Sequence, residues 1–293
     1  GLNSFIETLT EISFDENFDT GNLPSDIIPY MDGDQSNISP IMTQGGSVHQ
    51  FGPNAYTKPA AGLYLLRETI MGHELFDYAF KTYAQRWMFK HPTPEDFFRT
   101  MEDASALDLD WFWRGWFYTT DFNDIGIKKV NQYRVTSKPT KDVIKLAKSY
   151  GVSEAQIRPS IFLSTDEVTE GESKKPLDIQ ILKEYINKNY ANSTDAEIPS
   201  YFYEITFEKP GGLVMPIIVQ YTYDDGSIES KTYPAQIWSK NDKEVKKVVA
   251  SQKEITKIII DPKFETADVN NSNNTWPKEE KTEFDKIKES FQK

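Results

Sequence analysis

Residues 52–72, GPNAYTKPAAGLYLLRETIMG, carry a tyrosine just ahead of an apolar helical repeat. The breakers Gly52, Pro53 and Asn54 predict a loop, and the leucines and isoleucine that follow recur at helical spacing. A tyrosine hydroxyl presented there could donate a hydrogen bond to a developing negative charge. Composition alone favours a structural role for Tyr56 at a helix start, and Lys58 is expected to cap or pair locally rather than act as a base.

Histidine and cysteine limit the metal chemistry that this chain can hold. It has three histidines, at positions 49, 73 and 91, and no cysteine, which excludes disulfides and thiolate catalysis. His73-Glu74 begins the zinc motif H-E-x-x-H, but Asp77 stands where the second imidazole is required. We therefore interpret His73 as a helix boundary, His49 as a loop residue and His91 as part of a turn. No complete zinc site is expected within the chain.

The stretch DVNNSNN resembles part of a calcium-binding loop. Its first, third, fifth and twelfth positions would be Asp268, Asn270, Ser272 and Glu279. Asn273 replaces the glycine that the sixth position requires, and Pro277 interrupts the loop. A hydrogen-bonded, asparagine-rich turn is therefore favoured over a calcium site.

Charge and composition exclude other classes of function. The formal net charge is −12, which is unfavourable for binding nucleic acid, and the lysines of residues 240–247 are interleaved with acids as on a solvated surface. No apolar run is long enough to cross a bilayer, and no signal peptide is recognised in the chain. The nucleophile elbow G-x-S-x-G and the phosphate-binding motifs G-x-G-x-x-G and G-x-x-x-x-G-K-[ST] are absent.

The first 120 or so residues are predicted to be helical. Residues 1–9 place Leu2, Phe5, Ile6 and Leu9 on one stripe, and a second helix is expected from Tyr56 to Gly72. A third has an apolar face made of Leu75, Phe76, Ala79, Phe80, Tyr83 and Trp87.

Two further helices complete this part. The stretch HPTPEDFF predicts a helix start with Thr93 as the N-cap, Pro94 at the first position and Asp96 closing the cap. The stretch DLDWFWRGWFY predicts a buried helix whose broad apolar face is formed by Leu109, Phe112, Trp113, Trp116 and Phe117.

From Tyr201 the hydrophobic period changes to two. Strands are predicted in YFYEITFEK, LVMPIIVQYTY, SIESKTYPAQIW and EITKIIID, with a hairpin turn at Asp225-Gly226 and with Pro216 and Pro234 at edges or bulges. Residues 119–195 are mixed: a helix closed by Gly151, another in residues 176–190, and between them a loop whose 167–175 part should be cut first by proteases.

These patterns predict an α+β multidomain chain. It comprises a helical lobe at residues 1–121, a linker or mixed segment with short helices at 122–198, an antiparallel β-sandwich at 199–276, and a polar tail or short helix at 277–293.

Four stretches together resemble the aminopeptidase N family of zinc metallopeptidases, the thermolysin-like gluzincins. GLNSFIE resembles the sequence after the third zinc ligand of that family, with Gly1 as the glycine of N-E-G and Glu7 where members often carry another acid. AYTKPAAGLYLLRETIMG resembles the segment with the catalytic tyrosine, which would be Tyr56. Residues 83–121 resemble the helix pair that closes the catalytic domain, and residues 211–238 resemble the β-domain of some bacterial members. The likeness is weakest over residues 125–195.

The resemblance implies an aminopeptidase that hydrolyses N-terminal residues from peptides by zinc-activated water, with Tyr56 stabilising the tetrahedral oxyanion. Both zinc histidines, the general-base glutamate, the third ligand and the G-x-M-E-N strand would precede Gly1. The chain is therefore expected to be a C-terminal fragment, inactive alone and without a metal or cofactor of its own. Its partners would be a peptide substrate and the upstream half of its catalytic domain. The alternatives are a non-catalytic protein- or glycan-binding module and a degenerate, inactive family member.

Overall fold

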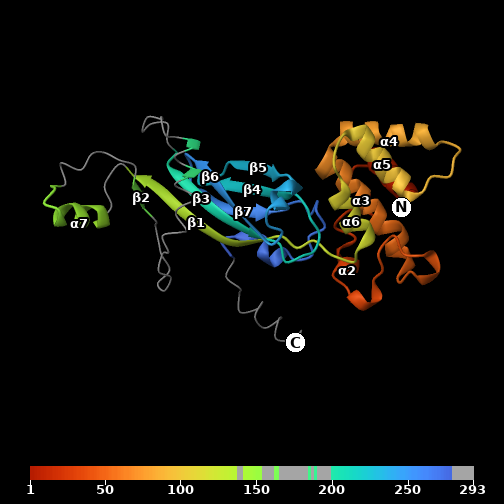
Figure 1. Cartoon of the computed structure of the whole chain (residues 1–293), viewed down its shortest axis with the longest axis horizontal. Coiled ribbons are helices and arrows are strands. Elements are labelled where there is room, and N and C mark those ends of the chain that lie inside the picture. Colours follow the sequence, from red (N-terminus) through yellow and green to blue (C-terminus); the bar gives the residue numbers. More distant parts are fainter. Residues whose placement is uncertain (137–140, 154–161, 165–183, 186–187, 190–198, 279–293) are drawn as a thin grey trace.

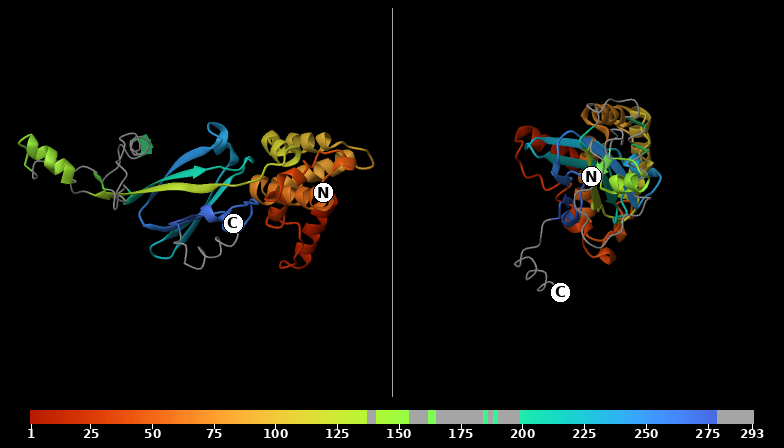
Figure 2. Two further views of the ribbon diagram at one scale, coloured as in Figure 1. Left: turned by 90° about the horizontal axis from the view of Figure 1, so that it is seen from below. Right: turned by 90° about the vertical axis from the view of Figure 1, so that its left-hand side faces the viewer.

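The computed structural model describes residues 1–136, 141–153, 162–164, 184–185, 188–189 and 199–278. Helices make up the N-terminal part, and antiparallel sheets make up most of the C-terminal part (Figure 1). A second view shows the helices and the sheets one after the other along the long axis of the molecule (Figure 2). Among the described helices, none combines the length and the apolar composition that crossing a bilayer requires.

Most of the helical elements lie in the first 118 residues. The α-helices are α1 (Leu2–Phe14), α2 (Ile28–Met31), α3 (Lys58–Leu65), α4 (His73–Trp87), α5 (Pro94–Ser105), α6 (Asp110–Tyr118) and, further along, α7 (Lys141–Ser149). Two π-helical turns, η3 (Pro53–Thr57) and η4 (Leu66–Met71), adjoin α3. Short 3₁₀ turns are η1 (Gln35–Asn37), η2 (Gly45–Ser47), η8 (Ala235–Ser239) and η9 (Asn271–Asn273).

Aromatic side chains hold the helices together. Phe5 of α1 packs edge-on against Phe76 and Phe80 of α4, and Phe98 of α5 stacks on Trp113 of α6 at 4.6 Å between ring centroids. The five apolar residues predicted on the buried face of α6 are all buried. The start of α5 is also confirmed, because Thr93 at the N-cap and Asp96 at the third helical position form the predicted capping box, with Pro94 between them.

The predicted stripe on α1 is wrong in part. Phe5 is fully buried, but Leu2 and Ile6 are 37% and 43% exposed, and the buried face carries Ser4 and Thr8 instead. The Thr8 hydroxyl donates to the carbonyl oxygen of Ser4 at 2.9 Å, which removes the cost of burying that hydroxyl. Ser4 and Thr8 therefore lie on the closely packed face of α1, while Leu2 and Ile6 remain at the surface.

Among the described residues, the strands form two four-stranded sheets in which every pair is antiparallel. One has the order β2-β1-β3-β6, from β1 (Gly126–Thr136), β2 (Phe162–Ser164), β3 (Tyr201–Glu208) and β6 (Glu244–Ser251). The other has the order β5-β4-β7-β8, from β4 (Ile217–Tyr223), β5 (Ile228–Tyr233), β7 (Ile255–Ile260) and β8 (Thr275–Trp276).

The two sheets share buried side chains. The Tyr203 hydroxyl of β3 accepts a hydrogen bond from the backbone N–H of Ile255 at 2.7 Å, and its ring meets Trp276 of β8 edge-on. Phe207 of β3 likewise approaches Tyr233 of β5. Residues of both sheets therefore belong to one apolar core.

Three strands differ from the sequence prediction. Strand β1 lies in the segment predicted as a linker, and its alternation is interrupted by a register shift between Ile127 and Lys129. Strand β6 carries Lys246 and Lys247 at the edge of its sheet, where charged residues are tolerated, and β8 is only two residues long. The sequence predicts a linker or mixed segment with short helices at 122–198, and Gly126–Thr136 of that segment form strand β1. The division into domains stays a prediction.

The turns between the strands agree better with the sequence prediction than the strands do. The hairpin at Asp225-Gly226 is confirmed, since it joins β4 to β5 and Gly226 has φ of 80°. Pro216 directly precedes β4 and Pro234 directly follows β5, so both prolines delimit strands rather than interrupt them. The predicted helix at 176–190 falls largely outside the described residues, as do the loop at 167–175 and residues 279–293 of the tail.

Candidate functional site

The helical segment that carries Tyr56 begins earlier than predicted, because the stretch Gly52-Pro53-Asn54 is helical rather than a loop. Residues 53–57 form the π-helical turn η3, and Gly52 has α-helical backbone angles. Proline is tolerated in a first helical turn because its missing N–H has no partner there. π-helical turns occur frequently at functional sites. Tyr56 therefore lies within a continuous helical segment that leads into α3.

Buried polar residues on both sides fix this turn. The Asn54 side chain is 1% exposed and donates to the carbonyl oxygens of Ser39 at 2.6 Å and Pro40 at 3.2 Å. The Ser39 hydroxyl in turn accepts from the backbone N–H of His49 at 3.0 Å. These bonds tie the turn to the preceding loop, so the backbone around Tyr56 has little freedom.

Lys58 faces the interior. It is fully buried, its ammonium group donates to the carbonyl oxygen of Thr119 at 3.4 Å, and it lies 5.9 Å from the ring centroid of Trp116. The Trp116 N–H donates to the Lys58 carbonyl oxygen at 2.8 Å. Burial lowers the pKa of Lys58 to about 8, against the opposing effect of Asp121. The expectation that Lys58 caps or pairs locally is therefore wrong, because its partners Trp116 and Thr119 are distant in the sequence and connect the start of α3 to α6 and the residue after it.

Tyr56 itself points outward. Its side chain is 53% exposed, its ring meets the Phe51 ring edge-on at 5.9 Å, and no hydrogen bond of its hydroxyl is formed with any described residue. The hydroxyl is therefore available to an incoming ligand. The amino group of Gly1 lies beside this turn and donates to the Ala55 carbonyl oxygen at 2.9 Å. An apolar hollow of about 300 Å³ adjoins Gly1 and Ala55.

The histidines do not come together with metal-binding geometry in the described part of the chain. His73 pairs with Glu68, and Asp77 is held by Arg67 through bonds of 2.7 and 3.0 Å that lower the pKa of Asp77. The Asp77 carboxylate therefore forms an ion pair with Arg67. His91 is exposed in the connection between α4 and α5, and helix α4 begins at His73 after Gly72.

The asparagine-rich turn after β7 is hydrogen-bonded as predicted. Asp268 is 1% exposed and accepts from the backbone N–H groups of Asn270 at 2.9 Å and Ile125 at 3.1 Å. Asn270 in turn accepts from the N–H of Ser272. Burial raises the pKa of Asp268 to about 7, with a further rise from neighbouring aspartates. Glu279, the twelfth position of the calcium alternative, lies outside the described residues.

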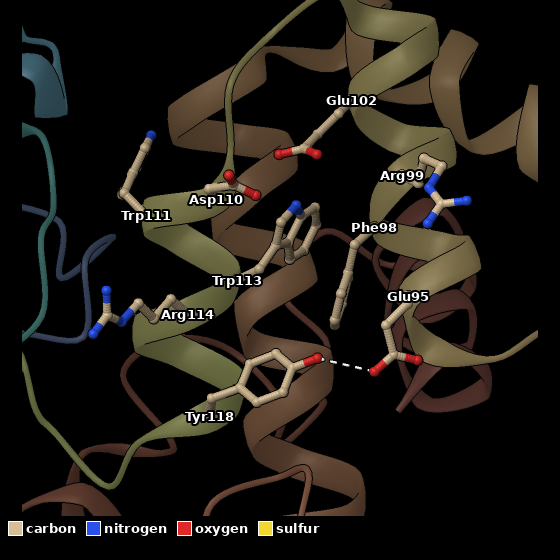
Figure 3. Close-up of a pocket in the computed structure, with 9 residues that line it drawn as sticks. All are labelled: Glu95, Phe98, Arg99, Glu102, Asp110, Trp111, Trp113, Arg114 and Tyr118. Carbon is tan, nitrogen blue, oxygen red and sulfur yellow. Dashed lines mark hydrogen bonds between the residues drawn. The ribbon is translucent and has the colours of Figure 1, made fainter.

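A second constellation was missed by the sequence analysis, which treated DLDWFWRGWFY only as a buried helix. A cavity of about 610 Å³ lies between α5 and α6, lined by Glu95, Phe98, Arg99, Glu102, Asp110, Trp111, Trp113, Arg114 and Tyr118 (Figure 3). Within the described residues, Glu102, Asp108 and Asp110 form the one acidic or histidine cluster compact enough to hold a metal ion. The sequence shows two of these acids as the D-x-D stretch of Asp108 and Asp110 at the start of α6. It does not show that Glu102 lies close to them, because that depends on how α5 packs against α6.

The comparisons with known proteins give a distant likeness to a solved structure. No protein-family model and no curated protein matches the sequence. Among solved structures, aminopeptidase A of Legionella pneumophila, crystallised in complex with aspartic acid, aligns with 92% of this chain at 13% identity and a TM-score of 0.46. The aligned part is 23% of that protein's length. The chain thus has a weak structural similarity to an aminopeptidase, and a likeness at this level does not indicate activity.

Proposed function

We propose that this chain is the C-terminal part of a zinc-dependent aminopeptidase of the gluzincin type and that Tyr56 stabilises the oxyanion of its tetrahedral intermediate. The observation that carries the proposal is an exposed tyrosine on a rigid turn, with buried Asn54 and Lys58 on either side and no described partner for its hydroxyl. Preorganised donors of this kind act because they need no rearrangement when charge develops.

The position of Gly1 fits the same proposal. Its amino group is bonded to the carbonyl of Ala55, next to Tyr56. A segment joined to Gly1 would therefore reach the protein surface beside the tyrosine, where zinc ligands on that segment could face its hydroxyl. In such a site zinc and the phenol would bind the same oxygen from two sides, while the two sheets would form the β-sandwich that follows the catalytic domain.

The test is Tyr56→Phe in the protein that joins this chain to the upstream half of the catalytic domain. The substitution removes one hydroxyl and keeps the ring against Phe51. We expect kcat to fall on the order of 100- to 1,000-fold with KM nearly unchanged, because the lost bond forms mainly in the transition state. Zinc content and the melting temperature should stay the same.

Tyr78→Phe is the matched control. Tyr78 is also exposed on a helix of this lobe, and its substitution removes the same atom away from the proposed site. Full kcat in Tyr56→Phe would remove the tyrosine from the active site. Absence of activity in the intact protein, together with specific retention of a protein or glycan by this chain, would favour the binding-module alternative.

A further inference from the structure

Strand β5 forms one edge of its sheet and lies open to solvent along nearly its whole length (Figure 1). Every residue from Ile228 to Thr232 is exposed, and only Tyr233 at the end is buried. The register with β4 is continuous over all six residues of β5, without a bulge. Such an edge offers a straight row of backbone groups to another extended chain.

The hydrogen bonds of the hairpin identify the free backbone groups of β5. The Tyr223 N–H donates to the Ser227 carbonyl oxygen at 2.9 Å. Opposite pairs in an antiparallel ladder alternate between bonded and non-bonded, so from Ser227 onward every second residue turns its backbone groups to β4. The residues between them, Ile228, Ser230 and Thr232, therefore point their N–H and C=O groups away from the sheet. These groups have no hydrogen-bond partner among the described residues.

The two charged side chains of β5 do not shield this edge, although charged side chains often protect exposed edges. The Glu229 carboxylate accepts from the Tyr223 hydroxyl of β4 at 2.6 Å, and the Lys231 ammonium lies 5.3 Å from the ring centroid of Tyr233. The Tyr233 hydroxyl is itself hydrogen-bonded to Tyr221 of β4 at 3.2 Å. Both charges are therefore held against their own sheet, and the strand is fixed in an extended form before a partner binds.

A cavity of about 380 Å³ lies at the end of β5. Its walls include Thr232 and Pro234 from the sheet and Leu107 and Trp111 from the helical part. Thr69 of η4 also lines it, and the buried Thr69 hydroxyl has no hydrogen-bond partner within the described part of the chain. A cavity that continues a free edge can enclose the end of a peptide that pairs with that edge.

The charge of the cavity selects the direction of the peptide. Asp108 lines the cavity and is exposed, and among the described hydrogen bonds its Oδ1 accepts from the Asp110 N–H while its Oδ2 is unused. Asp108 belongs with Glu102 and Asp110 to a compact group of carboxylates, which we call the α5–α6 corner. A positively charged amino terminus fits there, whereas a terminal carboxylate would be repelled. Because the cavity lies at the C-terminal end of β5, a chain whose amino terminus enters it runs antiparallel to the strand.

We propose that β5 binds an extended peptide as an additional antiparallel strand, with the amino terminus of the peptide in this cavity. The outward N–H and C=O groups of Ile228, Ser230 and Thr232 bind the peptide backbone, and these bonds do not depend on its side chains. The Ile228 side chain is 61% exposed and favours an apolar or β-branched residue beside it. This surface is separate from Tyr56, because neither β5 nor the cavity includes a residue of η3.

Fluorescence anisotropy tests the proposal on the chain as it is. The probe is the peptide Val-Thr-Val-Thr-Val-Thr with a free amino terminus, followed by a lysine amide that carries fluorescein on its side chain. Its β-branched residues favour the extended conformation. We expect saturable binding at one peptide per chain. Acetylation of the amino terminus should weaken binding about threefold to fivefold, because the charge that Asp108 attracts is lost.

Two N-methylated forms of the probe test the backbone pairing directly. One carries methyl groups on the amides of its second, fourth and sixth residues, and the other on those of its third and fifth residues. In an antiparallel pair, alternate residues point their N–H groups to the partner strand. One form should therefore bind more than about tenfold less tightly, while the other should bind within about threefold of the unmethylated probe.

Matched variants locate the peptide at β5. Thr232→Pro removes an N–H that points away from β4, at a sheet edge where proline is tolerated, and should weaken binding about tenfold. Thr232→Val keeps this N–H and the branched side chain and should bind the probe within about twofold of the unmodified chain. Asp108→Asn should remove the difference between the free and the acetylated probe. Asp103→Asn, which changes an exposed carboxylate outside the cavity, should keep that difference.

Three results would overturn the proposal. The first is the absence of saturable binding to the unmodified chain, and the second is an equal effect of the two methylation patterns. The third is a dimer of the chain that Thr232→Pro dissociates while the probe does not bind, which would identify a second copy as the partner of β5. Circular dichroism separates lost binding from lost folding in Thr232→Pro, and the methylated probes need no variant. No peptide is hydrolysed in these measurements, so their outcome is independent of the proposed peptidase function.

Discussion

Two groups of aspartate and glutamate in this protein differ in what their oxygens contact. The α5–α6 corner is open to solvent at Asp108 and Asp110, and it retains unused oxygens. The second group, which we call the buried turn, comprises Asp124, Asp261 and Asp268, which are at most 7% exposed.

Hydrogen-bond donors, some close in the sequence and some far away in it, occupy the carboxylate oxygens of the buried turn. Asp261 accepts from the N–H of Glu265, the N–H of Thr266 and the Thr266 hydroxyl, at 2.6 to 2.8 Å. Asp124 accepts from the side-chain amides of Asn273 and Asn270 at 2.7 and 3.4 Å. Carboxylates whose oxygens are used by buried donors hold the fold together, whereas the exposed carboxylates of Asp108 and Asp110 keep oxygens that no described donor uses.

The largest expected effect is on folding stability. Asp261→Asn replaces one acceptor oxygen by a donor that faces N–H or O–H groups, so it should lower the free energy of unfolding by about 2 kcal/mol. Asparagine tolerates the left-handed conformation of this position, where φ is 48°. The substitution therefore adds no backbone strain that would change the measured free energy of unfolding. Asp110→Asn is the same chemical change in the open corner and should alter stability by less than about 0.5 kcal/mol. Urea unfolding measures both, and equal losses would contradict the distinction.

A smaller effect should appear in the pH dependence of stability. Burial raises the pKa of Asp268 in the folded state to about 7, above its ordinary value of 3.8. The folded protein therefore holds this proton more tightly than the unfolded chain. The stabilising contribution of protonated Asp268 is fully present below pH 3.8 and is lost as the pH rises through about 7.

The comparison of the unmodified chain with Asp268→Asn isolates this contribution. The difference in their free energies of unfolding should change by about 1 kcal/mol per pH unit between about pH 5 and pH 6.5, with the unmodified chain losing stability as the pH rises. Urea unfolding at a series of pH values provides the measurement. A difference that is constant with pH would contradict a raised pKa at Asp268.

The smallest effect concerns the open corner. Burial raises the pKa of Glu102, and Asp110 and Asp108 raise it further, against the opposing hydrogen bonds from the Leu109 N–H and the Trp113 side chain. Glu102→Gln keeps an oxygen for Leu109 and removes one of three like charges. It should raise the melting temperature slightly, by an amount that corresponds to less than about 1 kcal/mol, because solvent screens these charges. A marked loss of stability would mean that the Glu102 charge is structural.

The helical part was the more predictable region. Helices depend on contacts within a few residues, so the capping box at Thr93 and the buried face of α6 follow from local patterns. Strand β1 was not predictable in the same way, because a register shift interrupts its alternation and its partners β2 and β3 follow later in the chain. The charged edge strand β6 gave no clear alternation either, since its residues are all half-buried.

The sequence by itself determined the types of chemistry that this chain can perform. Three histidines and no cysteine limit its metal chemistry, and the stretch around Tyr56 singles out that hydroxyl. Tertiary structure decided which groups are accessible: Lys58 is enclosed by Trp116 and Thr119, while Tyr56, two residues away, is exposed. It also brought Glu102 to Asp108 and Asp110. Burial and the convergence of side chains depend on how the elements pack, and that packing is not encoded in the spacing of any one motif.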